Sequence, residues 1–301
     1  MKRRNFLWYS TFFVISGCTA ATTNRNHREL GTGTPSAAVA KPEKLRFAVS
    51  DVQGTEDLQK DYEALRLVLV DMFGIPVEFF PVDSYIAAAS ALQQNQVDLV
   101  FTGPSEYVVM RARTNATPIA AIKRERYYPV IVVTAESGIK SVDALRGKTI
   151  AMWEVGSTSG YLGPTKLLID AGFDPKTDVK IELLGREGLP ALQAGKVDAW
   201  GGSIRRYDTF LESQKLTEAD LPIIQKGPDL PADPFVVSSG IAPGFVAEMR
   251  QRFFQNQDQI LKAIEPADGG KFTGATMIEA QDSDYDIIRE AYRAVGQGSF
   301  L

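Results

Sequence analysis

The sequence predicts an α/β fold built from two lobes of similar plan. From Leu45 onward, short apolar runs typical of strands alternate with stretches of helical periodicity. This alternation restarts after Thr134. In addition, residues 91–98 (ALQQNQVD) resemble residues 191–198 (ALQAGKVD), each typical of a helix that turns through Asn or Gly into a strand. Two lobes with the same plan would produce this echo, although a common helix-to-strand turn would also produce it.

The first half alternates strands with amphipathic helices. The longest helix is expected to begin at Thr55 and to end at Gly74, because Leu58, Tyr62, Leu65 and Leu69 recur on one side. Gly74 provides the usual helix stop. The strands expected here are 45–50, 76–81, 97–102, 118–122 and 130–134, and the other helices are 84–94 and 105–113.

The second half begins with a short helical turn and then repeats the alternation. The expected strands are 148–153, 179–184, 197–200, 222–225 and 235–239, and the expected helices are 161–172, 188–194 and 205–213. The remainder, 244–296, is predicted to be mostly helical.

The N-terminus has the features of an export signal. Lys2, Arg3 and Arg4 precede an apolar run, 6–15, that is too short to span a bilayer. Ile15-Ser-Gly-Cys18 resembles a bacterial lipobox, so we expect a signal peptide at 1–17, lipidation of Cys18 and a flexible tether at 18–42. Residues 3–7 also resemble a twin-arginine signal, which leaves the export route open.

The composition excludes several classes of site. The chain has 33 basic and 37 acidic residues and no basic block, which argues against nucleic-acid binding. Its single histidine, His27, lies in the expected tether, and its single cysteine is Cys18. Cys/His metal sites and Ser-His-Asp triads are therefore excluded from the folded part. We expect a binding protein with no cofactor, no metal and no catalytic residues.

Residues 156–160, Gly-Ser-Thr-Ser-Gly, are the most informative segment. They lie between an expected strand and an expected helix. A helix N-terminus offers unpaired N–H groups and partial positive charge, and Ser157, Thr158 and Ser159 add hydroxyl donors. This combination predicts a seat for an oxyanion. The alternative is an ordinary Ser/Thr helix cap.

Six short sequence motifs resemble those of one family, the periplasmic solute-binding proteins of ABC transporters for phosphonate, phosphite and phosphate-like anions. The motifs occur in the family's order at 97–104, 127–133, 145–150, 156–160, 195–198 and 230–234. The resemblance implies a two-lobed periplasmic-binding-protein fold with crossover strands near 132–136 and 233–237, which closes on a ligand like a hinged clamp. It places lobe 1 at 43–134 and 236–301, and lobe 2 at 135–235.

The same resemblance implies the ligand-binding residues. Ser157, Thr158 and Ser159 match the family's oxyanion donors, Tyr85 and Tyr127 match pocket tyrosines, and Asp233 matches a pocket carboxylate. Thr102 and Gly103 end a strand of lobe 1, where open α/β sheets bind ligands. Alternatively, Tyr85 and Tyr127 could be core tyrosines, and Asp233 could belong to an Asp-Pro turn.

Two departures from the family pattern bear on the ligand. Many members carry a histidine where this chain has Gly185-Arg186-Glu187, and binders of amine-bearing phosphonates carry a glutamate near the present Arg205. Arg205 would repel an ammonium group, which argues against an aminoalkyl-phosphonate. Arg186 and Arg205 could instead clamp a more anionic ligand, or be solvated surface residues. Trp153 and Trp200 could wall a small pocket or belong to the core.

The favoured function is therefore a lipid-anchored substrate-binding protein of an ABC importer, located outside the cytoplasmic membrane. It would capture a small phosphorus oxyanion and deliver it to a membrane permease. Two alternatives remain: an enzyme on the same fold, lyase- or dehydratase-like, with Asp233, Tyr85 and Tyr127 as acid–base groups, and a sensor module that presents its ligand to a receptor.

Overall fold

The computed structural model describes residues 41–52, 54–84 and 87–301. The expected signal peptide, Cys18 and nearly all of the expected tether lie outside these ranges, as does Tyr85. The helices are α1 (Thr55–Phe73), α2 (Ala87–Gln93), α3 (Pro104–Thr114), α4 (Gly163–Asp170), α5 (Gly188–Gln193), α6 (Ile204–Gln214), α7 (Pro243–Gln255), α8 (Gln257–Ile264), α9 (Ala267–Gly270) and α10 (Asp286–Ala294).

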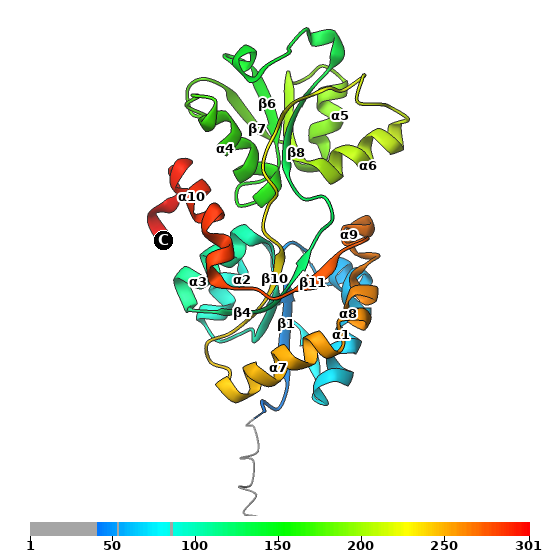
Figure 1. Ribbon diagram of the computed structural model, residues 1–301, viewed down its shortest axis with the longest axis vertical. Coiled ribbons are helices and arrows are strands. Elements are labelled where there is room, and N and C mark those ends of the chain that lie inside the picture. The colour runs from blue at the N-terminus through cyan, green and yellow to red at the C-terminus, as the bar shows by residue number, and fades with distance from the viewer. Residues whose placement is uncertain (1–40, 53, 85–86) are drawn as a thin grey trace, which may run out of the picture. The chain divides into compact units, whose positions relative to one another are not determined.

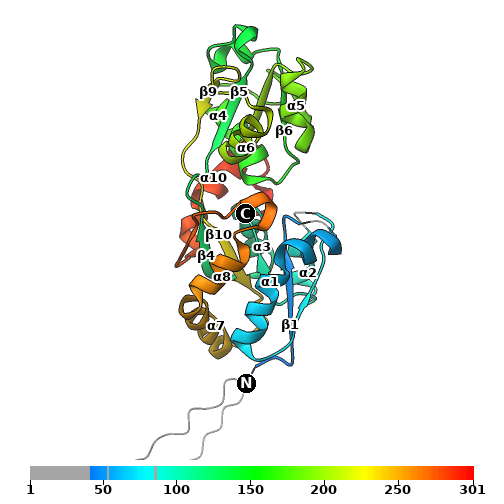
Figure 2. The ribbon, with the colours of Figure 1, turned by 90° about the vertical axis from the view of Figure 1, so that its right-hand side faces the viewer.

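The strands form two sheets (Figures 1 and 2). The six-stranded sheet has the order β11-β4-β10-β3-β1-β2, from β1 (Leu45–Val49), β2 (Val77–Phe79), β3 (Leu99–Phe101), β4 (Thr117–Lys123), β10 (Asp233–Val237) and β11 (Thr276–Ile278). In it β1 runs parallel to β2 and β3, whereas β10 is antiparallel to β3 and β4. The expected helical region 244–296 thus contains the strand β11.

The five-stranded sheet repeats this plan. Its order is β7-β6-β8-β5-β9, from β5 (Pro129–Val133), β6 (Thr149–Met152), β7 (Lys180–Leu183), β8 (Ala199–Ser203) and β9 (Ile223–Lys226). Here β6 is parallel to β7 and β8, and β5 is antiparallel to β8 and β9. Figure 1 shows α4 on one side of this sheet and α5 and α6 on the other. The α/β prediction is confirmed.

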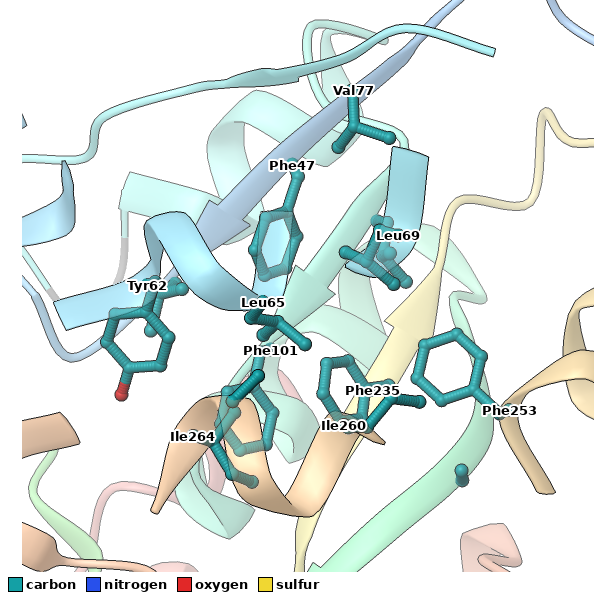
Figure 3. Close-up of a cluster of buried hydrophobic side chains, with 14 of the residues drawn as sticks. Phe47, Tyr62, Leu65, Leu69, Val77, Phe101, Phe235, Phe253, Ile260 and Ile264 are labelled. Carbon is teal, nitrogen blue, oxygen red and sulfur yellow. The ribbon is translucent and has the colours of Figure 1, made fainter. Parts of the chain in front are cut away.

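Aromatic rings form the centre of the core beside the six-stranded sheet. Phe101 and Phe235 are buried on neighbouring strands and stack with centroids 4.3 Å apart at 13°. Figure 3 shows these rings beside Phe253, with Leu65 and Leu69 from α1 above them. Helix α1 contributes the apolar face that its periodicity predicted, and α8 contributes a second apolar face. This half therefore has a continuous core of its own.

The chain passes between the sheets twice, at 124–128 and at 227–232. Both passages come before the crossovers expected near 132–136 and 233–237, because β5 pairs with β8 and β9 of the five-stranded sheet and β10 pairs with β3 and β4 of the six-stranded sheet. An apolar run predicts that a strand forms but does not show which sheet the strand joins. We therefore propose lobes of 41–123 with 233–301, and of 129–226.

A buried ion pair joins the start of the first passage to the strand that follows the second passage. Arg124 follows β4, and Asp233 opens β10 beside it. Arg124 Nη2 donates to Asp233 Oδ1 at 2.7 Å, and Nε lies 2.6 Å from Oδ2, with side chains 10% and 3% exposed. Burial alone would lower the pKa of Arg124, but Asp233, Tyr127 and Asp51 raise it above its ordinary value, so the guanidinium stays charged.

Replacing Arg124 with Gln is expected to lower the free energy of unfolding by about 3–5 kcal/mol, because it leaves the carboxylate of Asp233 buried without a partner. Urea denaturation of the wild type and variant measures this loss. Arg126→Gln is the matched control: its pair with Asp208, also 2.7 Å, is 54% and 39% exposed, so a loss under about 1 kcal/mol is expected. Equal losses in both variants would contradict a special role for Arg124.

Candidate ligand-binding site

A cavity of about 400 Å³ is lined by residues that follow strands of both sheets. Asp51 follows β1, Gly103 and Glu106 follow β3, Ser157 follows β6, Arg186 follows β7, and Arg205 follows β8. Because these strands are parallel within each sheet, their carboxyl ends lie at the same edge, which is where α/β sheets bind ligands. The first passage contributes Arg124 and Tyr127, and the start of β10 contributes Asp233.

The hydroxyl segment begins a helix, as expected, but the first turn is π-helical, Thr158–Leu162, and continues into α4 with Pro164 near its start. Ser157 is the N-cap, and its Oγ accepts a hydrogen bond from the N–H of Gly160 at 3.3 Å. The capping interpretation therefore holds for Ser157. The two interpretations are compatible, since a hydroxyl that accepts at its oxygen can still donate its hydrogen.

Gly160 allows this segment to lie against the end of β6. The N–H of Trp153 donates to the carbonyl of Gly160 at 2.9 Å, and a Cβ at position 160 would lie 2.4 Å from Trp153 Cβ. Any larger residue would push the turn away from the strand. Gly160 thus sets the position of the N–H groups of Thr158 and Ser159, which lie in a first helical turn without intrahelical acceptors.

Thr158 also connects the segment to α3. The N–H of Ser105 donates to Thr158 Oγ1 at 3.1 Å, and the two hydroxyl oxygens are 2.6 Å apart. Ser105 Oγ donates to the carbonyl of Gly156 at 2.6 Å. Both side chains are buried. Ser157 and Ser159 remain half-buried at the cavity wall, so they present the hydroxyls that a ligand can reach.

The wall next to the six-stranded sheet carries paired charges. Lys271 forms an ion pair with Asp51, and Arg124 pairs with Asp233 as described. Burial raises the pKa of Asp51, but the positive charges of Lys271, Arg124 and Arg206 outweigh burial and hold it below its usual value. Burial raises the pKa of Asp233, and Arg124 and Lys271 oppose that rise. The charges of Arg124 and Lys271 on this wall are thus each matched by a carboxylate.

The wall next to the five-stranded sheet is positive. Arg186 is exposed, Arg205 Nη2 donates to the carbonyl of Gly269 at 2.5 Å, and the Arg206 guanidinium lies 3.6 Å from the centroid of Trp153. No ion pair with a carboxylate is found for these three arginines among the described residues. An anion in the cavity would be the natural partner of their charge.

Most of the predicted site residues lie together at the cavity: Gly103, Tyr127, Ser157, Thr158, Ser159, Arg186, Arg205 and Asp233. Thr102 is not part of the wall, because its hydroxyl is buried against Ser50 Oγ at 2.6 Å. Tyr85 lies outside the described residues. Trp153 and Trp200 both line the cavity, and Trp200 is also only 2% exposed, so it serves the core as well.

The sequence analysis missed Asp51, Glu106, Arg124, Arg206 and Lys271, which also line the cavity. The rule of strand carboxyl ends, applied to β1, would have indicated Asp51. Glu106 follows Gly103-Pro104 in the first turn of α3, another position that this rule covers. No local pattern marks Lys271, which reaches the cavity from a segment far along the chain.

Within the described part of the chain, no group of three or more His, Cys, Asp or Glu residues could hold a metal ion. Nor does any helix of these residues have the length and apolar content to cross a membrane.

Comparisons with known proteins agree on one family. Residues 47–285 match the family described as ABC transporter, phosphonate, periplasmic substrate-binding protein. The phosphate-import protein PhnD of Mycolicibacterium smegmatis is 24% identical over 295 residues, which cover 88% of this chain and 91% of the relative.

Solved structures show the same fold. PhnD1 from Prochlorococcus marinus, in complex with methylphosphonate, has a TM-score of 0.69 at 21% identity, with coverage of 85% of this chain and 100% of that one. A Xanthomonas citri protein bound to ATP has a TM-score of 0.72 at 17% identity, with coverage of 85% and 98%.

The family consists of substrate-binding proteins rather than enzymes, so its partners are a small ligand and a membrane permease. The family match spans most of the chain and includes every strand after β1. This chain therefore belongs to the phosphonate periplasmic substrate-binding proteins of ABC transporters.

Proposed function

We propose that this protein captures a small phosphorus oxyanion at Ser157, Thr158 and Ser159 and delivers it to the permease of an ABC importer. The observation that carries the proposal is the position of this hydroxyl segment, which opens a helix at the wall of the cavity described above. Hydroxyl and N–H donors in a helical first turn suit the oxygens of a tetrahedral anion. The names of two relatives, one a phosphate importer and one bound to methylphosphonate, support the same ligand class.

The charges around the cavity narrow the ligand class. The wall near the five-stranded sheet offers Arg186, Arg205 and Arg206, whereas the cations of the opposite wall, Arg124 and Lys271, are each paired with a carboxylate. A ligand with two negative charges, or with a second acidic group, gains from these arginines, and an ammonium group loses. The cavity of about 400 Å³ exceeds the volume of a tetrahedral anion, so an organic substituent fits as well.

Binding is proposed to close the two lobes on the ligand. Two contacts that already cross between the halves support this: Ser105 with Thr158, and Arg205 with the carbonyl of Gly269. Each involves residues at the cavity wall. A ligand that touches Thr158 and Arg205 would therefore stabilise the arrangement in which those contacts exist.

The protein is further proposed to be anchored by a lipid at Cys18, after removal of the signal peptide 1–17. The resemblance of Ile15–Cys18 to a lipobox carries this proposal. The segment that follows, up to residue 42, would serve as a tether that lets the folded part reach the permease.

Replacing Ser159 with Ala is expected to weaken oxyanion binding about 10- to 100-fold, because a hydrogen bond to a charged ligand contributes roughly 1.5–3 kcal/mol. Ser159 is chosen for the substitution instead of Ser157, because replacing Ser157 would also remove a helix cap. Isothermal titration calorimetry with phosphate and methylphosphonate measures the change. Ser137→Ala, at an exposed hydroxyl away from the cavity, should bind as the wild type does; unchanged binding by the Ser159 variant would exclude the segment from the site.

A ligand panel tests the charge argument. We expect phosphite, phosphate, methylphosphonate or phosphonoacetate to bind, and 2-aminoethylphosphonate to bind at least about tenfold more weakly than methylphosphonate, a difference of ~1.4 kcal/mol. In Arg205→Gln that difference should shrink, because the positive charge that opposes the ammonium group is gone. If 2-aminoethylphosphonate binds most tightly, the charge argument is refuted. If no ligand of the panel binds, the proposed ligand class is refuted.

Replacing Cys18 with Ser is expected to move the protein from the membrane fraction to the extracytoplasmic soluble fraction of expressing bacteria, because the lipid attachment site is lost. Fractionation followed by immunoblotting measures the distribution. Ser16→Thr, next to the cysteine, serves as a control that should remain in the membrane fraction. Membrane retention of the Cys18 variant would contradict the lipid anchor.

A further inference from the structure

Glu106 is a buried acid in the wall of an anion-binding cavity. It lies in the first turn of α3, is 5% exposed, and lines the cavity. Its carboxyl group folds back over the start of its own helix, where Gly103 leaves room: a Cβ at position 103 would lie 2.6 Å from Glu106 Oε2. A permanent negative charge at this place would oppose the ligand that the family binds.

The hydrogen bonds around Ser105 indicate a protonated carboxyl group. Ser105 Oγ lies 2.7 Å from Glu106 Oε2, 2.6 Å from the carbonyl oxygen of Gly156 and 2.6 Å from Thr158 Oγ1. A hydroxyl has one hydrogen to donate. The carbonyl of Gly156 and an ionised Glu106 can only accept, so the single hydrogen of Ser105 cannot serve both contacts, while Thr158 can donate to Ser105. All three contacts contain a hydrogen only when Glu106 is protonated and donates to Ser105 Oγ.

The electrostatic surroundings favour the same state near neutral pH. The pKa of Glu106 is raised to about 7: burial is the largest cause and Asp51 adds to it, while the Ser105 hydroxyl and Lys271 lower the pKa. Tyr127 from the first passage and Tyr292 from α10 also face this carboxyl group, and both phenols stay neutral because burial raises their pKa values. The segment around Thr158 adds hydroxyls and no charge.

We infer that Glu106 links oxyanion binding to proton uptake: as a neutral acid it completes the hydrogen bonds that hold Gly156 and Thr158 beside α3, and as a carboxylate it opposes the bound anion. This inference rests on the proposed function and adds to it a residue that selects the protonation state of the complex. Glu106 acts here as a positioning residue through Ser105 and as a charge near the ligand.

Calorimetric titration of methylphosphonate at pH 8, in two buffers with different heats of ionisation, counts the protons taken up on binding. Most of the carboxyl group is ionised at this pH in the free protein, so the wild type should take up close to one proton more than Glu106→Gln. The ligand's own ionisation is common to both proteins and cancels in the difference. Between pH 7.5 and 9, the affinity of the wild type should fall by up to about tenfold per pH unit relative to the variant.

The matched control is Glu187→Gln. Glu187 is an exposed acid next to Arg186 of the cavity wall, so this variant removes a nearby negative charge without removing a buried proton site. It should take up as many protons as the wild type. Equal proton uptake in the wild type and Glu106→Gln would overturn the inference, while the binding itself would leave the proposed function standing.

A measurement without ligand keeps the two proposals separable. The folded-state pKa of Glu106 lies above its ordinary value, so its stabilising contribution is full below about pH 4.5 and is lost as the pH rises through about 7. The melting temperature of Glu106→Gln relative to the wild type should therefore rise from pH 5 to pH 8. A difference in melting temperature that stays constant with pH would overturn the inference, whether or not a ligand binds. Failure of methylphosphonate and phosphate to bind would instead refute the proposed ligand class.

Discussion

The ion pair between Arg124 and Asp233 is the constraint on which the rest of the site depends. Both groups are charged and nearly buried, so each requires the other, and the two passages between the sheets must lie side by side. The guanidinium also covers Tyr127, with its centre 3.2 Å from the ring centroid, which holds that residue at the cavity wall. Because its charge is already matched by Asp233, Arg124 does not attract an anion as a free cation would. The attraction must come from the opposite wall.

That wall is built by close packing at glycines. A side chain at Gly160 would collide with Trp153, and one at Gly188 or Gly202 would collide with the ring of Trp200. These glycines leave room for both indole rings, and the Arg206 guanidinium stacks on Trp153, 3.6 Å from its ring centroid, at the cavity wall. The proposed oxyanion donors are therefore held by packing rather than by ion pairs, which leaves their hydrogen-bonding capacity for a ligand.

The sequence predicted what depends on local pattern and missed what depends on distant pairing. Strand and helix alternation, the role of Gly74 as a helix stop and the hydroxyl segment all follow from neighbouring residues, and they agree with the structure. Thr102 was placed at the cavity because it ends a strand, yet its hydroxyl faces Ser50, 52 positions away. The partners of Asp233 and Asp51 lie 109 and 220 positions away, so no window of sequence contains them. The sheet to which β5 belongs is likewise decided by β8 and β9, which come much later in the chain.

The proposed seat of neutral donors, beside a wall whose cations are already paired, has a consequence for transport. A binding protein must hold its ligand and also release it, and a cavity of unpaired buried cations would bind an anion strongly but would destabilise the empty protein. Here the buried charges are paired before any ligand arrives, and the three arginines that remain are exposed or half-buried, where water stabilises them. In the proposed site a ligand would gain mainly from oriented N–H and hydroxyl groups, whose arrangement depends on contacts such as that between Ser105 and Thr158. Loss of those contacts weakens the seat without exposing an unpaired charge, so opening of the proposed lobes and release of the anion can be a single step.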